Sequence, residues 1–164
     1  MPLRDSRTVR GAERLGRRIR TIVENLALPV LTNDIGSLLV KRTKDRFEQE
    51  VDPDGVPWKP LNRKYAAQKA AEGHRTKILQ RTGTLKDSIR KIQGTPTGTL
   101  YTNTGAGVRI GVDEDKVPYA RYHQEGTRAI PRRVFLGVGR LDVKAVDSLL
   151  RRKSKSLQRE LEAP

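Results

Sequence analysis

Residues 52–61 read Asp-Pro-Asp-Gly-Val-Pro-Trp-Lys-Pro-Leu and hold three of the nine prolines and the only tryptophan of the chain. The first four residues are typical of a tight turn. Proline presets φ, aspartate side chains bond to their own backbone, and Gly55 accepts a positive φ. Pro57 and Pro60 then exclude a helix through Trp58. The sequence therefore predicts a rigid turn followed by a constrained indole, and the rest of the chain is arranged around it.

Trp58 is expected to anchor this loop. A buried indole removes roughly 150–250 Å² from water, more than most other side chains. Two interpretations stay open at this point. The loop packs on its own domain, or it is presented to a partner subunit.

The composition of the chain limits the class of protein. The 164 residues suffice for one domain with appended elements, and an apolar share of 35% indicates a modest core. The formal net charge of +15 favours a polyanionic partner or an acidic protein surface. The absence of cysteine excludes disulfides and thiolate metal sites. No apolar run approaches about 18 residues, so we expect a soluble protein made and used inside a cell, with no membrane partner.

Residues 5–27 are predicted to form a basic amphipathic helix. Apolar side chains recur at steps of three and four on one face, at Ala12, Leu15, Ile19, Ile22, Val23 and Leu26. Arginines recur in the same way on the opposite face, at Arg7, Arg10, Arg14 and Arg17. Such a stripe suits a solvated face, an acidic protein surface or the phosphates of nucleic acid. A membrane surface ranks last because aromatic anchors are missing.

Two further helices are predicted before residue 75. Pro29 is expected to interrupt the first pattern, so the second helix should begin near residues 32–34 and end near Glu50. A shorter helix should cover about residues 62–72, with Tyr65, Ala66 and Ala70 as its packing side chains.

The middle of the chain has β character. A helix tail or a strand is expected around residues 86–93, and a hairpin should pair Thr99–Asn103 with Gly107–Val112. Residues 113–116 should form an exposed turn. Their carboxylates resemble a metal cluster, but solvation is the simpler interpretation, and no metal or cofactor is predicted.

A short helical turn should span Tyr119–Gly126 and end at the glycine. His123 lies near Glu125, yet no serine, cysteine or second histidine is near in sequence to complete a nucleophile set. We therefore expect a hydrogen-bonded structural histidine and no enzymatic activity. Residues 130–137 should form a kinked entry into an apolar strand or a helix.

The last predicted helix runs from Asp142 to about Leu161. Its buried face is expected to consist of Val143, Val146, Leu149 and Leu150. Its later half carries a cluster of positive side chains, Arg151, Arg152, Lys153 and Lys155, which suits the negative end of the helix dipole. The chain contains no Gly-rich phosphate loop, HExxH motif or zinc-finger spacing.

An ordered series of motifs carries a resemblance over roughly residues 35–150. The series comprises Phe47 with residues 52–61, Ile78–Leu85 with Ser88-Ile89, Val108–Gly111, Tyr119-Ala120 with His123–Gly126, and Ile130–Gly137. It resembles the phage virion morphogenesis family, the tail-completion proteins of Mu-like and related long-tailed phages.

The resemblance implies an α+β subunit, with a small twisted antiparallel sheet packed against long N-terminal and C-terminal helices. It implies a structural protein of the virion head–tail junction, present in the host cytoplasm during assembly, without catalysis. Its partners would be copies of itself in a ring, six-fold or higher, neighbouring head, neck and tail proteins, and genomic DNA in the channel.

From these patterns we divide the chain into three parts: a basic N-terminal arm at residues 1–30, a core domain at 31–150 and a basic end at 151–164. Side chains expected to shape subunit contacts or anchor loops are Trp58, Tyr119, Tyr122, His123 and Phe135. Side chains expected to contact DNA or acidic neighbours are Arg10, Arg14, Arg17, Arg18, Arg151, Arg152 and Lys153. Two alternatives stay open: a nucleic-acid-binding protein, and an assembly factor absent from the finished particle.

Overall fold

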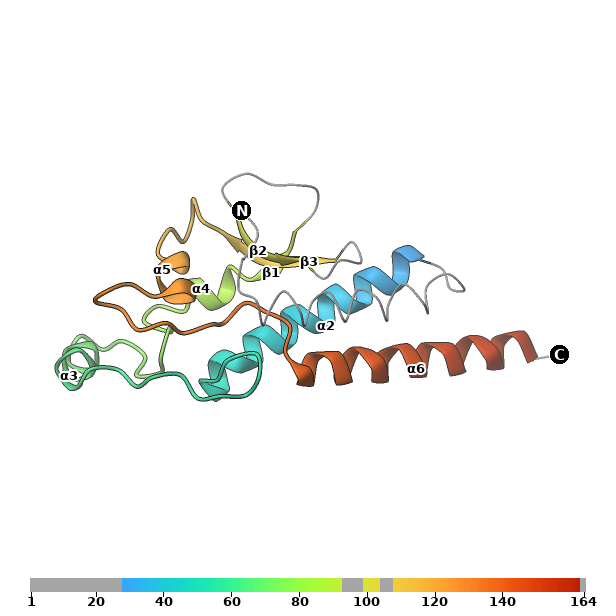
Figure 1. The fold of residues 1–164 in the computed structure, drawn as a ribbon, viewed down its shortest axis with the longest axis horizontal. Coiled ribbons are helices and arrows are strands. Elements are labelled where there is room, and N and C mark those ends of the chain that lie inside the picture. Colours follow the sequence, from blue (N-terminus) through green and yellow to red (C-terminus); the bar gives the residue numbers. More distant parts are fainter. Residues whose placement is uncertain (1–27, 93–98, 104–107, 163–164) are drawn as a thin grey trace.

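The computed structural model describes residues 28–92, 99–103 and 108–162, as eight helices and strands (Figure 1). The predicted helix at residues 5–27 lies outside these residues. In chain order the elements are α2 Leu28–Gln49, α3 Arg63–Ala71, α4 Thr84–Asp87, β1 Arg90–Lys91, β2 Thr99–Asn103, β3 Arg109–Asp113, α5 Ala120–Glu125 and α6 Arg140–Glu162. The mixture of helices with one small sheet confirms the α+β class.

The three strands form one antiparallel sheet in the order β1-β3-β2. Strand β2 pairs with β3 in the register Leu100↔Val112, which confirms the predicted pairing. Val108, just before β3, and Ile110 and Val112 within it are all buried, as their period-two spacing predicts, although Gly111 between the last two is buried as well. Within the described residues 86–92, helix α4 ends at Asp87 and strand β1 covers Arg90–Lys91, so both interpretations of that stretch were partly right.

The two long helices lie side by side and run in opposite directions, with the sheet on the other side of α2 (Figure 1). Between them, α2, β3 and α6 bury one apolar cluster made of Leu31, Ile35, Leu39, Val108, Ile110, Val138, Val143, Val146 and Leu150. This cluster confirms the predicted buried face of α6 at Val143, Val146 and Leu150, and Leu149 is partly buried against it.

The predicted start of the second helix was wrong. Helix α2 begins at Leu28, before the expected N-cap residues at 32–34, and Pro29 lies within its first turn. A proline is tolerated there because the first N–H groups of a helix have no partner inside the helix.

Two other local predictions were also wrong. In α3, Tyr65 is 42% exposed and Ala70 is exposed, whereas the buried side chain is that of Lys69. Residues 130–137 form no helix or strand. Their backbone is held by the buried Gln124 side chain, whose Oε1 accepts bonds from the N–H groups of Phe135 and Leu136 and whose Nε2 donates to Leu136 O.

A buried ion pair joins α2 to the start of α6. The Asp142 carboxylate, 0% exposed, accepts bonds from Arg46 Nη2, from Arg42 Nε at 2.6 Å and from Gly139 N at 2.8 Å. Arg46 also donates through Nη1 to the carbonyl oxygens of Phe135 and Gly137, both at 3.1 Å. This network fixes the irregular segment before α6 against α2.

Replacement of Asp142 by alanine should lower the free energy of unfolding by about 3–5 kcal/mol, because Arg46 would be left buried without its counter-charge. Urea denaturation followed by circular dichroism measures this. The matched control is Asp45→Ala, which removes an exposed carboxylate paired with Lys41 and should change stability by less than about 1 kcal/mol. Equal losses in the two variants would contradict the role given to Asp142.

Candidate functional site

The turn at residues 52–56 has the predicted geometry. Asp52 Oδ1 accepts bonds from the N–H groups of Asp54 and Val56 at 2.9 and 2.8 Å, and Asp52 N donates to Val56 O at 2.8 Å. Gly55 has φ of 86°, which only glycine adopts without strain. We call residues 52–56 the acidic loop. Its backbone shape is fixed by these local hydrogen bonds.

The acidic loop is also pressed against the start of α6. A Cβ atom added at Gly139 would lie 1.8 Å from Pro53 O, so only glycine permits this approach. Arg140 N lies 3.4 Å from Asp54 Oδ1, and the exposed side chain of Leu141 lies beside Gly55. The loop and the first turn of α6 therefore form one surface.

Trp58 and Phe135 anchor segments inside the chain's own core. Trp58 is 6% exposed and Phe135 is 0% exposed. The indole Nε1 donates to Val134 O at 2.8 Å, and its ring meets that of Phe47 edge-on at 5.4 Å. Of the two interpretations left open for Trp58, packing on its own domain describes this geometry.

The aromatic residues of α5 are more exposed. Tyr122 is 53% exposed, and Tyr119, 39% exposed, meets His123 edge-on at 6.1 Å. His123 Nδ1 is buried and has no hydrogen-bond partner among the described residues, so the expected hydrogen-bonded histidine is not found. Burial lowers the pKa of His123, and the positive charge of Arg133 lowers that pKa further. Burial likewise raises the pKa of Tyr119.

Tyr119 and His123, but not Tyr122, border a cavity of about 830 Å³, which we call the His123 cavity. Its walls come from α3, from residues 79–85, from the start of α5 and from residues 129–133. The apolar and aromatic part of the lining is Leu61, Tyr65, Leu79, Leu85, Tyr119, Ala129, Ile130 and Pro131. None of the lining residues is an aspartate or a glutamate.

Two nearly buried cations line the His123 cavity. Lys69, 2% exposed, donates to Lys77 O at 2.6 Å, and burial lowers the pKa of Lys69. Arg133, 5% exposed, donates to the carbonyl oxygens of Lys59 and Pro60 at 2.8 and 3.0 Å. Neither side chain forms an ion pair with any residue in the described part of the chain. The negative charge of Glu50 opposes the lowering of the Lys69 pKa by burial, whereas the Arg133 guanidinium is met by two backbone carbonyl oxygens.

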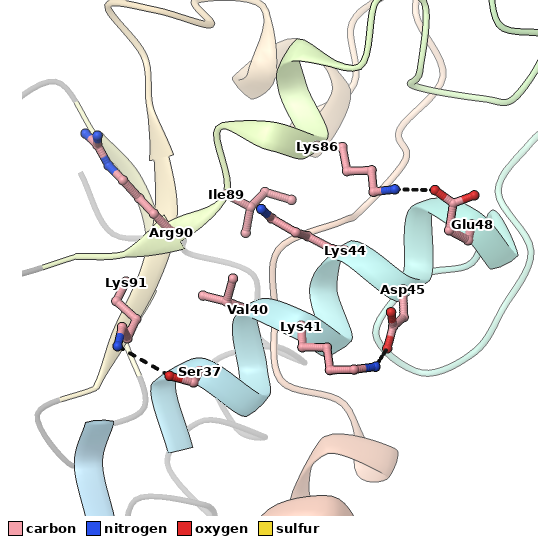
Figure 2. Close-up of a pocket in the computed structure, with 10 residues that line it drawn as sticks. All are labelled: Ser37, Val40, Lys41, Lys44, Asp45, Glu48, Lys86, Ile89, Arg90 and Lys91. Atoms are coloured by element: carbon pink, nitrogen blue, oxygen red, sulfur yellow. Dashed lines mark hydrogen bonds and ion pairs between the residues drawn. The ribbon is translucent and has the colours of Figure 1, made fainter. Parts of the chain in front are cut away.

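A second hollow, of about 620 Å³, lies between α2 and residues 86–91 (Figure 2). We call it the basic groove. Its lining contains five cations and two carboxylates: Lys41, Lys44, Lys86, Arg90, Lys91, Asp45 and Glu48. Figure 2 shows Lys44 extending from α2 toward Ile89. Lys41 instead donates a hydrogen bond to Asp45, and Lys86 donates one to Glu48. Asp113, outside the lining, also pairs with Arg90, but the lysines and arginine still outnumber the carboxylates, and the remaining positive charge suits an anionic partner.

Sequence reasoning missed both hollows. The walls of each come from segments more than 30 residues apart, and only the packing of the chain brings them together. The clustering of Lys86, Arg90 and Lys91 was visible in the sequence, but their position opposite α2 was not. Of the predicted electrostatic contacts, Arg10, Arg14, Arg17 and Arg18 lie outside the described residues. Arg151 and Arg152 are exposed, and Lys153 pairs with Asp34 at 2.8 Å.

The acidic turn at residues 113–116 is engaged in ion pairs. Asp113 pairs with Arg90 at 3.1 Å, and Glu114 pairs with Arg121 at 2.6 Å. Across residues 28–92, 99–103 and 108–162, no group of three or more histidine, aspartate or glutamate side chains is placed to hold a metal ion. In the same residues, no helix is both long and apolar enough to span a membrane.

Comparisons with known proteins give one family. Residues 11–155 match the phage virion morphogenesis family. A relative from Haemophilus influenzae, Mu-like prophage FluMu G protein 1, is 31% identical over 131 residues, which cover 79% of this chain and 82% of the relative. No solved structure matches the chain.

Replacement of Trp58 by alanine should lower the free energy of unfolding by about 3–5 kcal/mol. Trp58→Phe should lower it less, by about 1–3 kcal/mol, because it keeps an aromatic ring but leaves the partly buried Val134 carbonyl without its indole donor. Chemical denaturation measures both. Tyr122→Ala is the control, and at an exposed position it should change stability by no more than about 0.5 kcal/mol. A stable Trp58→Ala variant that fails only in assembly would place the indole at an interface instead.

Glu48 makes stability depend on pH. Its hydrogen bonds with Lys77 and then Lys86 lower its pKa to about 2, below the value of about 4.3 in an unfolded chain. A lowered folded-state pKa adds stability above the unfolded value, and this stability is lost as the pH falls toward about 2. In urea titrations at pH 7, wild type should therefore have a larger free energy of unfolding than Glu48→Gln. This difference should shrink as the pH falls below about 4.3 toward about 2.

The control for this titration is Asp45→Asn, since Asp45 has a single lysine partner and should show a smaller difference at pH 7. A difference between wild type and Glu48→Gln that stays constant down to the lowest pH would contradict the role of the Glu48 carboxylate.

Proposed function

Because the chain belongs to the phage virion morphogenesis family, we propose that it is a structural subunit of the head–tail junction, working without catalysis. In this proposal the subunits form a homo-oligomeric ring that completes the tail or connects it to the head. The observation that carries the proposal is the family match, which runs from residue 11 to residue 155 and so includes the acidic loop, the sheet, all of α2 and most of α6.

The mechanism of such a subunit is packing between rigid surfaces. A ring subunit needs two different faces, each complementary to the other face of its neighbour. The chain offers preformed surfaces of this kind, since the acidic loop is fixed by its own bonds and the Tyr119–Gly126 turn ends at a glycine with φ of 80°. Prior rigidity favours assembly because less conformational entropy is lost when subunits join.

Charge would then guide the subunit to its neighbours. The exposed Arg151 and Arg152 and the basic groove give it positive surfaces. We propose that these surfaces face acidic virion proteins or the genomic DNA that passes through the junction. Both partners present negative charge, and salt would weaken either contact.

The same surfaces support a second candidate function, a nucleic-acid-binding protein that acts apart from the particle. Its binding would fall steeply with salt. Reversal of Arg10, Arg14 and Arg17 to glutamate tests it by DNA retention on a filter at several salt concentrations. Retention that does not change on reversal would contradict this function for the N-terminal stripe.

Particles of the phage that encodes the chain test the first proposal. Loss of the protein should leave filled heads and separate tails, and its supply in trans should restore joined particles, as counted by electron microscopy. Mass spectrometry of purified complete virions should find the protein at a ring-like copy number. Joined, infectious particles that lack the protein would contradict a place in the junction and would favour an assembly factor that leaves the finished particle.

A further inference from the structure

The His123 cavity has the chemistry of a site for an anionic, partly apolar segment. Much of its lining is apolar or aromatic, and its charged lining residues are cationic, although Glu72, outside the lining, pairs with Arg81. Lys69 and Arg133 are almost fully buried, and neither forms an ion pair in the described part of the chain, although the charge of Glu50 acts on Lys69. A buried charge without a paired counter-ion is unfavourable, so a carboxylate that entered the cavity would stabilise Arg133 above all. His123 adds a buried nitrogen, Nδ1, that has no hydrogen-bond partner among the described residues.

The acidic loop has the complementary chemistry. Val56 is 58% exposed and Leu141, on the same surface, is 51% exposed, although both are apolar. Asp54 is exposed beside them, and Asp52 lies at the base of the loop. The loop therefore presents an apolar tip next to negative charge. Its shape is fixed by the Asp52 hydrogen bonds and by the close approach of Pro53 to Gly139.

We propose that the His123 cavity of one copy of the chain receives the acidic loop of a second copy. This inference rests on the self-association in the proposed function and names the contact that would produce it. Val56 enters the apolar part of the cavity, and the Asp54 carboxylate approaches Lys69 and Arg133. Opposite charge selects this occupant, because the cavity lining carries no acidic side chain and the loop residues carry no basic one.

The contact joins two different surfaces, since no lining residue of the cavity belongs to the acidic loop. Each bound copy therefore keeps one free cavity and one free loop. A contact of this kind is heterologous, and its repetition gives a ring when the rotation closes or an open filament when it does not. A symmetric dimer would not result.

Two variants, each lacking one half of the contact, test the proposal. The loop variant, Asp54→Asn with Val56→Asn, removes the charge and the apolar tip at two exposed positions. The cavity variant, Ala129→Glu, places a carboxylate at an exposed lining position, where it repels the incoming loop. The control is Ala67→Glu, which makes the same change at an exposed alanine of α3 outside the cavity lining. Thermal melts establish that all four proteins are folded.

Sedimentation velocity over a concentration series gives the result. We expect wild type and Ala67→Glu to form the same closed or extended oligomers. The loop variant and the cavity variant should each associate at least about tenfold more weakly and sediment as monomers. An equimolar mixture of the two should form dimers and nothing larger, because it restores one intact loop and one intact cavity per pair.

Three outcomes would overturn the inference. They are a wild type that stays monomeric at every concentration, variants that associate as wild type does, and a mixture that gives no dimer. If Ala129→Glu associated as wild type does, the cavity would not be the binding site for the loop of another copy, and a segment of a different protein would be its occupant. None of these outcomes bears on whether the protein is present in purified virions, so the particle experiment judges the proposed place in the junction separately.

Discussion

The buried pair of Arg46 and Asp142 is the constraint on which the other surfaces depend. One carboxylate satisfies two guanidinium groups and the N–H of Gly139, while Arg46 also holds two carbonyl oxygens of the segment before α6. The pair therefore ties α2, an irregular segment and α6 into one unit. Because this network fixes Gly139, Pro53 can pack against it. The position of the acidic loop therefore depends on the Arg46–Asp142 salt bridge, to which the loop contributes no atom.

Local sequence patterns predicted the elements whose cause is local. The turn at residues 52–56 follows from proline, aspartate and glycine in order, and the hairpin follows from the alternation of Val108, Ile110 and Val112. The pattern failed where a distant side chain does the work. Residues 134–136 are apolar and resemble a strand, but the N–H groups of Phe135 and Leu136 and the C=O of Leu136 bond to the Gln124 side chain rather than to a neighbouring strand.

The family was predictable because its motifs follow one another in a fixed order along the chain, and this order can be recognised in the sequence without knowledge of the fold. The two hollows were not predictable, since each joins segments that are distant in sequence. Lys69 shows the reason. A lysine in a polar helix is expected to be solvated, yet packing of α3 against residues 77–81 buries it. The division into residues 1–30, 31–150 and 151–164 stays a prediction, as does the role given to each candidate contact residue.

Strand β1 has a consequence for how copies of the chain meet. It forms one edge of the sheet, but it is only two residues long, and both of its side chains, Arg90 and Lys91, are exposed and positively charged. A short, charged edge offers an approaching strand few backbone groups to pair with and repels an identical edge. Crowded copies are therefore discouraged from growing a continuous intermolecular sheet along this edge, which would lead to irreversible aggregation, while contacts that depend on particular side chains remain available.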